Sequence, residues 1–79
     1  MAQVGGYVRA IVAAGKYLAI HTADNSHEIR VANDNSSFDT IKQMALSAAQ
    51  TSAKLTAEVD SGGYINGIAT VTYNVPGLP

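Results

Sequence analysis

Only one stretch of the sequence repeats its apolar residues with the period of an α-helix, and it lies among segments that follow the period of a β-strand. In residues 38–50 the apolar positions are Phe38, Ile41, Met44, Ala45 and Ala48, opposite Asp39, Lys42, Gln43, Ser47 and Gln50. Ser36 and Ser37 are candidate N-caps, with Asp39 placed for a capping box. The pattern predicts an amphipathic helix of about four turns. Leu46 and Ala49 on its outer face indicate either a slightly apolar surface or a contact with a neighbouring subunit.

Five other segments have the composition of β-strands, and several alternate apolar and polar residues. They are residues 7–14, 17–22, 27–32, 54–59 and 64–73. The Asp-Ser-Gly-Gly run at 60–63 predicts a hairpin loop, and Gly67 predicts a bulge or sharp bend. We interpret the pairs Gly5-Gly6 and Gly62-Gly63 as turn glycines, and residues 74–79 as a tail.

The order of three strands, one helix and two strands predicts a mostly β fold with one α-helix. This is the layout of the five-stranded Greek-key barrel of the OB fold, although the same elements would also form an α+β sandwich. A length of 79 residues indicates one domain, residues 1–79, with an ordered core over about 7–73. Because the chain has no cysteine and no evident metal site, association between copies is an expected source of stability.

The charge pattern argues against nucleic acid as a partner. The formal net charge is −1, and the basic residues stand singly at Arg9, Lys16, Arg30, Lys42 and Lys54. The longest apolar stretch, residues 10–14, is far shorter than a membrane helix, so membrane insertion is not expected. The N-terminus has no signal-peptide pattern, and the lack of cysteine leaves the compartment open.

The sequence does not predict an enzyme. His21 and His27 are close enough in sequence to share a metal with Glu28 or Asp24, but two ordinary histidines are the alternative that we favour. There is no GxSxG motif, and the carboxylates are scattered over turns and strands. We therefore expect no catalytic residue, no metal and no cofactor.

A carbohydrate site is the binding function that the residues favour. Sugar binding needs a few polar side chains beside one aromatic face, and residues 60–66 offer both. Tyr64 would supply the ring, and the hydrogen bonds would come from Asp60, Ser61 and Asn66, joined across an interface by Asn33 and Asn35. The alternative is that these residues only form turns. The other tyrosines, Tyr7, Tyr17 and Tyr73, lack the positive surroundings that single-stranded nucleic acid requires.

Several runs resemble the B subunits of bacterial AB5 toxins. Residues 48–73 resemble the Shiga toxin B subunit in having an alanine-glutamine helix end, a threonine- and valine-containing strand and a glycine-rich loop that closes on an aromatic residue. Residues 15–22, 30–33 and 37–42 are similar to the B subunits of subtilase cytotoxin and typhoid toxin. Together the runs span most of residues 7–73.

The resemblance implies an OB-fold homopentamer that binds cell-surface glycans, assembles with a catalytic A-type subunit and is secreted or periplasmic. It places the aromatic residue of the loop at Tyr64, beside Gly63, and a sugar-binding residue of the second strand at His21. The family's usual disulfide has no counterpart here, and its serine-bearing segment corresponds to residues 4–6, Val-Gly-Gly. Sialic acid is therefore not indicated as the ligand. The alternatives are a structural oligomer without a small ligand and a monomeric OB module for single-stranded nucleic acid.

Overall fold

The computed structural model describes residues 2–23, 28–65 and 71–75. The described chain is mostly β with one helix, in agreement with the predicted fold class. Its elements are β1 (Ala2–Ala13), β2 (Tyr17–Thr22), β3 (Ile29–Ala32), α1 (Phe38–Thr51), β4 (Lys54–Val59) and β5 (Val71–Asn74). The predicted bounds of β2 and β4 are confirmed, and so is the position of the helix.

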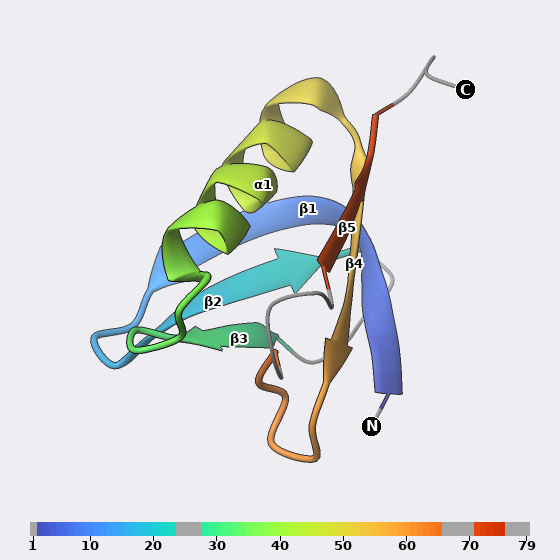
Figure 1. The fold of residues 1–79 in the computed structure, drawn as a ribbon. Coiled ribbons are helices and arrows are strands. Elements are labelled where there is room, and N and C mark those ends of the chain that lie inside the picture. Colours follow the sequence, from blue (N-terminus) through green and yellow to red (C-terminus); the bar gives the residue numbers. More distant parts are fainter. Residues whose placement is uncertain (1, 24–27, 66–70, 76–79) are drawn as a thin grey trace.

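The five strands form one antiparallel sheet in the order β3-β2-β1-β4-β5. Strand β1 is central and has two partners in succession, because residues 2–7 pair with β4 and residues 8–13 pair with β2. The register with β2 shifts between Val8 and Ala10, which marks a bulge at Arg9. Figure 1 shows β1 curving strongly as it passes from one partner to the other.

The prediction that Gly5 and Gly6 form a turn before the first strand is wrong. Both glycines lie inside β1, which begins at Ala2 and not at Tyr7. Their φ angles are 155° and 141°, and a Cβ atom on Gly5 would lie 2.1 Å from the carbonyl oxygen of Leu55. Gly5 therefore allows the backbone of β1 to approach β4 more closely than a residue with a side chain could.

The helix begins where the sequence predicts, but its cap differs. Ser37 is the N-cap residue, yet its side chain makes no capping hydrogen bond. The Oδ1 atom of Asn35 instead accepts the N–H of Ser37 at 2.8 Å. At the other end Ser52 adopts a left-handed conformation and donates its N–H to the carbonyl of Ala48.

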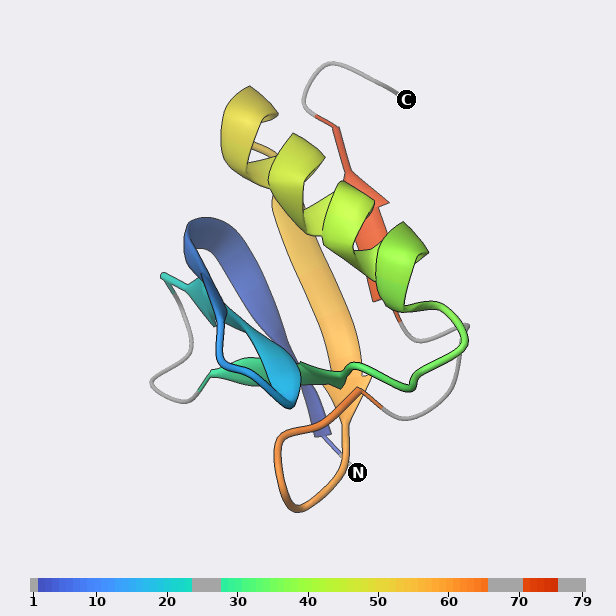
Figure 2. The same ribbon diagram turned by 90° about the vertical axis from the view of Figure 1, so that its left-hand side faces the viewer.

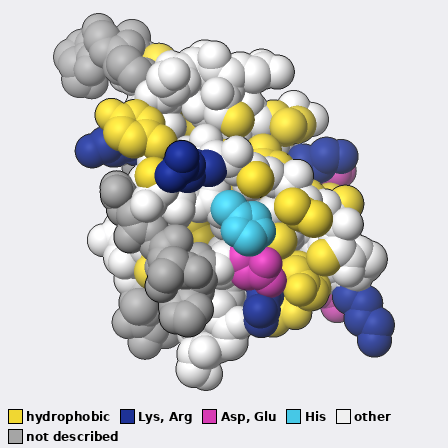
Figure 3. Space-filling view, turned by 180° about the vertical axis from the view of Figure 1, so that it is seen from behind, with side chains coloured by type: hydrophobic (Ala, Val, Ile, Leu, Met, Phe, Trp, Pro, Cys, Tyr) yellow, Lys and Arg dark blue, Asp and Glu magenta, His cyan; other side chains and the backbone are white. Residues whose placement is uncertain are grey.

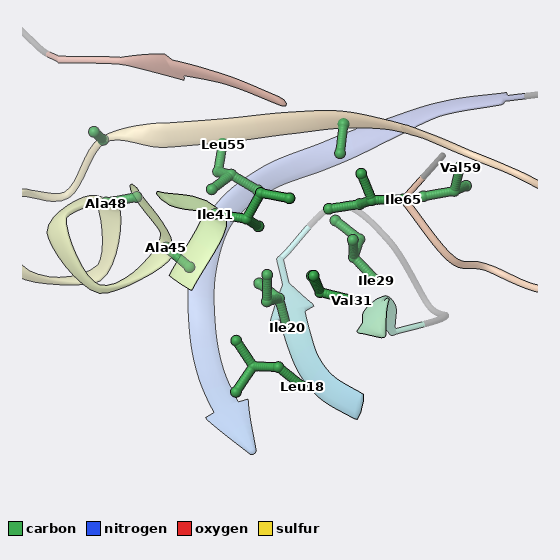
Figure 4. Close-up of a cluster of buried hydrophobic side chains, with 12 residues drawn as sticks. Leu18, Ile20, Ile29, Val31, Ile41, Ala45, Ala48, Leu55, Val59 and Ile65 are labelled. Carbon is green, nitrogen blue, oxygen red and sulfur yellow. The ribbon is translucent and has the colours of Figure 1, made fainter. Parts of the chain in front are cut away.

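The core lies between the curved sheet and α1, which contacts β1, β3, β4 and β5 (Figures 1 and 2). Figure 4 shows Ile41, Ala45 and Ala48 of the helix pointing toward side chains from the strands. The largest fully buried side chains are Ile20, Ile29, Val31, Ile41 and Leu55. On the outer face of the helix, Leu46 is 37% exposed, as the sequence predicts.

The fifth strand is only partly as predicted. The ladder between β4 and β5 covers residues 71–74, whereas the prediction was one strand over 64–73. Tyr64 and Ile65 form isolated bridges, a parallel one between Tyr64 and Arg30 and an antiparallel one between Ile65 and Val59. Gly67, the predicted bulge, lies outside the described residues.

Candidate binding site

The outer face of β2 and β3 gathers three side chains that alternate with core residues. In β2, Leu18 and Ile20 point into the core, which turns Tyr17 and His21 outward. In β3, the core residues Ile29 and Val31 leave Arg30 on the same outer face. The antiparallel register pairs Arg30 with Ala19, so that Arg30 lies between Tyr17 and His21 along the strand direction.

The loop after β4 adds Tyr64 to this face. Oδ1 of Asp60 accepts the N–H of Gly62 at 2.9 Å and that of Tyr64 at 3.1 Å, which holds the loop in a tight turn. Gly63 has a φ of 84°, and its carbonyl accepts the N–H of Arg30 at 2.8 Å. This backbone bond fastens the loop to β3 and places Tyr64 beside the side chains of the sheet.

Arg30 lies next to both tyrosine rings. Its guanidinium carbon is 5.4 Å from the ring centroid of Tyr17 and 5.8 Å from that of Tyr64. The two rings meet edge to face, with centroids 5.8 Å apart and planes at 75°. The Nη1 atom of Arg30 donates to the carbonyl of Gly62 at 3.1 Å, which links the cation to the loop.

Glu28 joins these groups through one carboxylate. Its Oε1 accepts from Nε of Arg30 at 2.7 Å and from the hydroxyl of Tyr17 at 3.2 Å, and its Oε2 lies 3.5 Å from Nε2 of His21. The hydrogen bond from Arg30 lowers the pKa of Glu28, and the same bond raises the pKa of Arg30. We call Tyr17, His21, Glu28, Arg30 and Tyr64 the tyrosine–arginine cluster.

The tyrosine–arginine cluster remains open to solvent. The side chain of His21 is 47% exposed and that of Arg30 is 37% exposed. On the face seen in Figure 3, a histidine, an acidic and a basic side chain follow one another in a line bordered by hydrophobic side chains. A ligand on this face would meet aromatic rings, hydrogen-bond donors and a carboxylate together.

Five of the predicted site residues lie in this cluster or in its loop. Tyr64 and His21 belong to the cluster, and Asp60, Ser61 and Gly63 form the loop that carries Tyr64. The Oδ1 atom of Asp60 accepts two backbone N–H groups of the loop, so this side chain stabilises the turn. Ser61 is exposed in the loop.

Asn33 and Asn35, two other predicted site residues, lie in turns outside the cluster. Asn33 donates from its side chain to the carbonyl of Gly15, and Asn35 accepts the N–H of Ser37, so both asparagines fix turns. Within residues 2–23, 28–65 and 71–75, no hydrogen bond joins either asparagine to the tyrosine–arginine cluster. Asn66 lies outside the described residues.

Sequence reasoning missed Tyr17, Glu28 and Arg30 as parts of one site. The alternation of β2 already placed Tyr17 and His21 on one face, and the same rule applied to β3 would have added Arg30. The pattern could not predict the contact between β3 and the loop at 63–65, because this pairing joins residues more than 30 positions apart.

A metal site finds no support in the described part of the chain. No group of three or more histidine, aspartate or glutamate side chains there is arranged to hold a metal ion. His27 and Asp24, which the alternative metal site required, lie outside the described residues. None of the helices in the described ranges is long and apolar enough to cross a membrane.

Comparison with known proteins found no similar protein. No protein-family model, no curated protein and no solved structure matches this chain. The functional argument therefore rests on the geometry of the cluster.

Proposed function

We propose that this protein is a glycan-binding module of the OB type and that sugars bind at the tyrosine–arginine cluster. The observation that carries the proposal is the cluster itself, in which Tyr17, Arg30 and Tyr64 meet on one exposed face beside the loop after β4. In OB folds, the face of the second and third strands and the loop between the fourth and fifth strands bind oligosaccharides and oligonucleotides.

The backbone bonds at residues 63–65 support the OB assignment. Arg30 donates its N–H to Gly63 and accepts from the N–H of Ile65 at 2.8 Å each, in a parallel arrangement. On the other side of the same segment, Asp60 donates to the carbonyl of Tyr64 at 2.9 Å. The segment thus connects β3, at one edge of the sheet, with the end of β4, which is how an OB barrel would close.

The mixture of groups in the cluster suits a sugar. Hydroxyl groups both donate and accept, and the cluster offers donors on Arg30, an acceptor on Glu28 and either function on His21. A tyrosine ring beside these groups can pack against the apolar face of a pyranose. No single strong charge dominates, because Glu28 compensates Arg30.

Single-stranded nucleic acid is the second candidate. An arginine near two tyrosine rings is an arrangement on which bases can stack. Phosphate binding, however, needs uncompensated positive charge, and Arg30 is paired with Glu28 at 2.7 Å. We therefore rank this function below glycan binding.

The proposal also includes assembly into a ring, which the resemblance to AB5 toxin B subunits implies. Large hydrophobic side chains exposed in the described structure support an interface between copies, and they are Tyr7, Val12 and Leu46. A catalytic partner chain on such a ring remains part of the proposal.

The function is tested by comparing the binding of Tyr64→Ala and of the unmodified protein to a glycan array. We expect the variant to bind its glycans about tenfold more weakly or worse, because loss of a ring contact of about 1.4 kcal/mol has that effect. Tyr64→Phe keeps the ring and should keep most of the binding.

Tyr7→Ala is the matched control. Tyr7 is 48% exposed, its ring lies 5.4 Å from the ammonium of Lys54, and it is not a member of the cluster. The mass of this variant in solution is measured alongside, and where it equals that of the unmodified protein, glycan binding should be unchanged. If Tyr64→Ala binds as the unmodified protein does, or if the unmodified protein binds no glycan, the glycan proposal fails. Steeply salt-dependent binding of single-stranded DNA would favour the second candidate.

A further inference from the structure

The charges of the site restrict which sugars it can accept. Arg30 is the cation of the tyrosine–arginine cluster, and its Nε is held 2.7 Å from Oε1 of Glu28. Asp60 adds a second carboxylate in the loop that carries Tyr64. Counting the formal charges of Arg30, Glu28 and Asp60, the cluster and its loop carry −1 with His21 neutral.

An acidic group on the ligand could not reach Arg30 without approaching Glu28. The short Nε–Oε1 contact places the glutamate carboxylate within a few ångströms of any anion bound to the guanidinium. The hydroxyl of Tyr17 also donates to Oε1, which holds the carboxylate in this position. Because both groups are partly exposed, the repulsion should weaken as salt concentration rises.

Two other cations belong to neighbouring parts of the sheet. Arg9 lies in the bulge of β1, and β2 separates that strand from β3, so the usual strand spacing puts their backbones about 10 Å apart. Lys16 belongs to the turn before Tyr17. Within the described ranges neither cation forms an ion pair with Glu28, whose ionic partners there are Arg30 and His21.

We infer that Glu28 is a specificity-determining residue and that the site takes uncharged sugars while it disfavours sugars that carry a carboxylate or a sulfate. This inference rests on the proposed glycan function. In the site, Glu28 offers an acceptor to a neutral hydroxyl group and repels an acidic substituent.

The test compares matched pairs of oligosaccharides, one neutral and the other carrying a sialic acid or a sulfate on the same backbone. We expect the unmodified protein to bind the neutral member about tenfold more tightly, because the carboxylate of Glu28 repels an acidic group that approaches Arg30. Glu28→Gln keeps an acceptor of the same shape and removes the charge. It should reduce the preference severalfold, and added salt should reduce the preference of the unmodified protein.

Glu58→Gln is the control with the same change in net charge. Glu58 lies on β4, in register with Gln3 of β1, and no ion pair joins it to the cluster in the described structure. This variant should keep the preference for neutral sugars. If the unmodified protein binds the acidic member equally or more tightly, the inference fails while the proposed glycan function stands. The same holds if Glu28→Gln keeps the preference for neutral sugars unchanged. Binding of no glycan at all would overturn the proposed function and the inference with it.

Discussion

At the scale of single residues, Glu28 joins three other side chains of the candidate site. One carboxylate contacts Arg30, Tyr17 and His21 at 2.7, 3.2 and 3.5 Å. Tyr64 was predicted as a site residue from its loop, because an aromatic residue after a polar glycine turn is visible in the sequence. Glu28 and Arg30 were not, because a single charged residue in a strand does not reveal which residues lie on the adjacent strands and loops.

The ion pair between Glu28 and Arg30 should make stability depend on pH in the acidic range. The pKa of Glu28 is lowered from its ordinary value of 4.5, mainly by the hydrogen bond from Arg30. The folded state thus favours the ionised carboxylate, and the stabilisation is complete above this ordinary value. It is lost as the pH falls through the lowered pKa of the folded state.

Thermal unfolding of the unmodified protein and Glu28→Gln would measure this contribution. We expect the variant to melt at a lower temperature near about pH 7, and the difference to shrink as the pH falls below the ordinary pKa of 4.5 and through the lowered pKa of the folded state. A difference that stays constant over this range would show that the pair does not contribute through the charge of Glu28.

At the scale of elements, the sequence predicted best where one residue pattern determines the structure. The bounds of β2 and β4 follow from alternation, and the helix follows from its apolar repeat. The predicted start of β1 was wrong because two adjacent glycines are typical of turns, whereas Gly5 lies close against Leu55 of β4 here. That fit depends on a strand about 50 residues later, which local patterns do not contain.

The proposed OB barrel depends on the backbone hydrogen bonds of residues 63–65 for its closure. If these residues pair with β3 as proposed, the amide protons of Arg30 and Ile65 should exchange slowly with solvent, because each is held in a 2.8 Å backbone hydrogen bond. Hydrogen exchange followed by NMR would measure this. The exposed Ser61 of the same loop is the control and should exchange quickly. Fast exchange at Arg30 and Ile65 would contradict the proposed barrel.

At the scale of the whole molecule, the small size of the chain and its exposed hydrophobic side chains favour association between copies. The chain has a mass of 8.2 kDa and exposes Tyr7 and Val12 by about half and Leu46 by somewhat more than a third. A small core gives limited stability, which an interface between copies would increase.

Light scattering of the purified protein would settle the mass in solution. We expect a closed ring, and five chains of 8.2 kDa would give about 41 kDa. A single species of 8.2 kDa at micromolar concentration would contradict the ring, while the candidate binding site, which lies within one chain, would be unaffected.

The two successive partners of β1 have a consequence for how the chain folds during synthesis. Residues 8–13 meet β2 soon after both leave the ribosome, but residues 2–7 pair with residues 54–59, which emerge some 50 residues later. Until then residues 2–7 present an unpaired strand edge, which other chains could join. The side-chain-free backbone of Gly5 and Gly6 also leaves this edge without bulky groups to block such pairing. We therefore expect aggregation mainly while the sheet is still being completed slowly, and not as a result of a weak core in the folded protein.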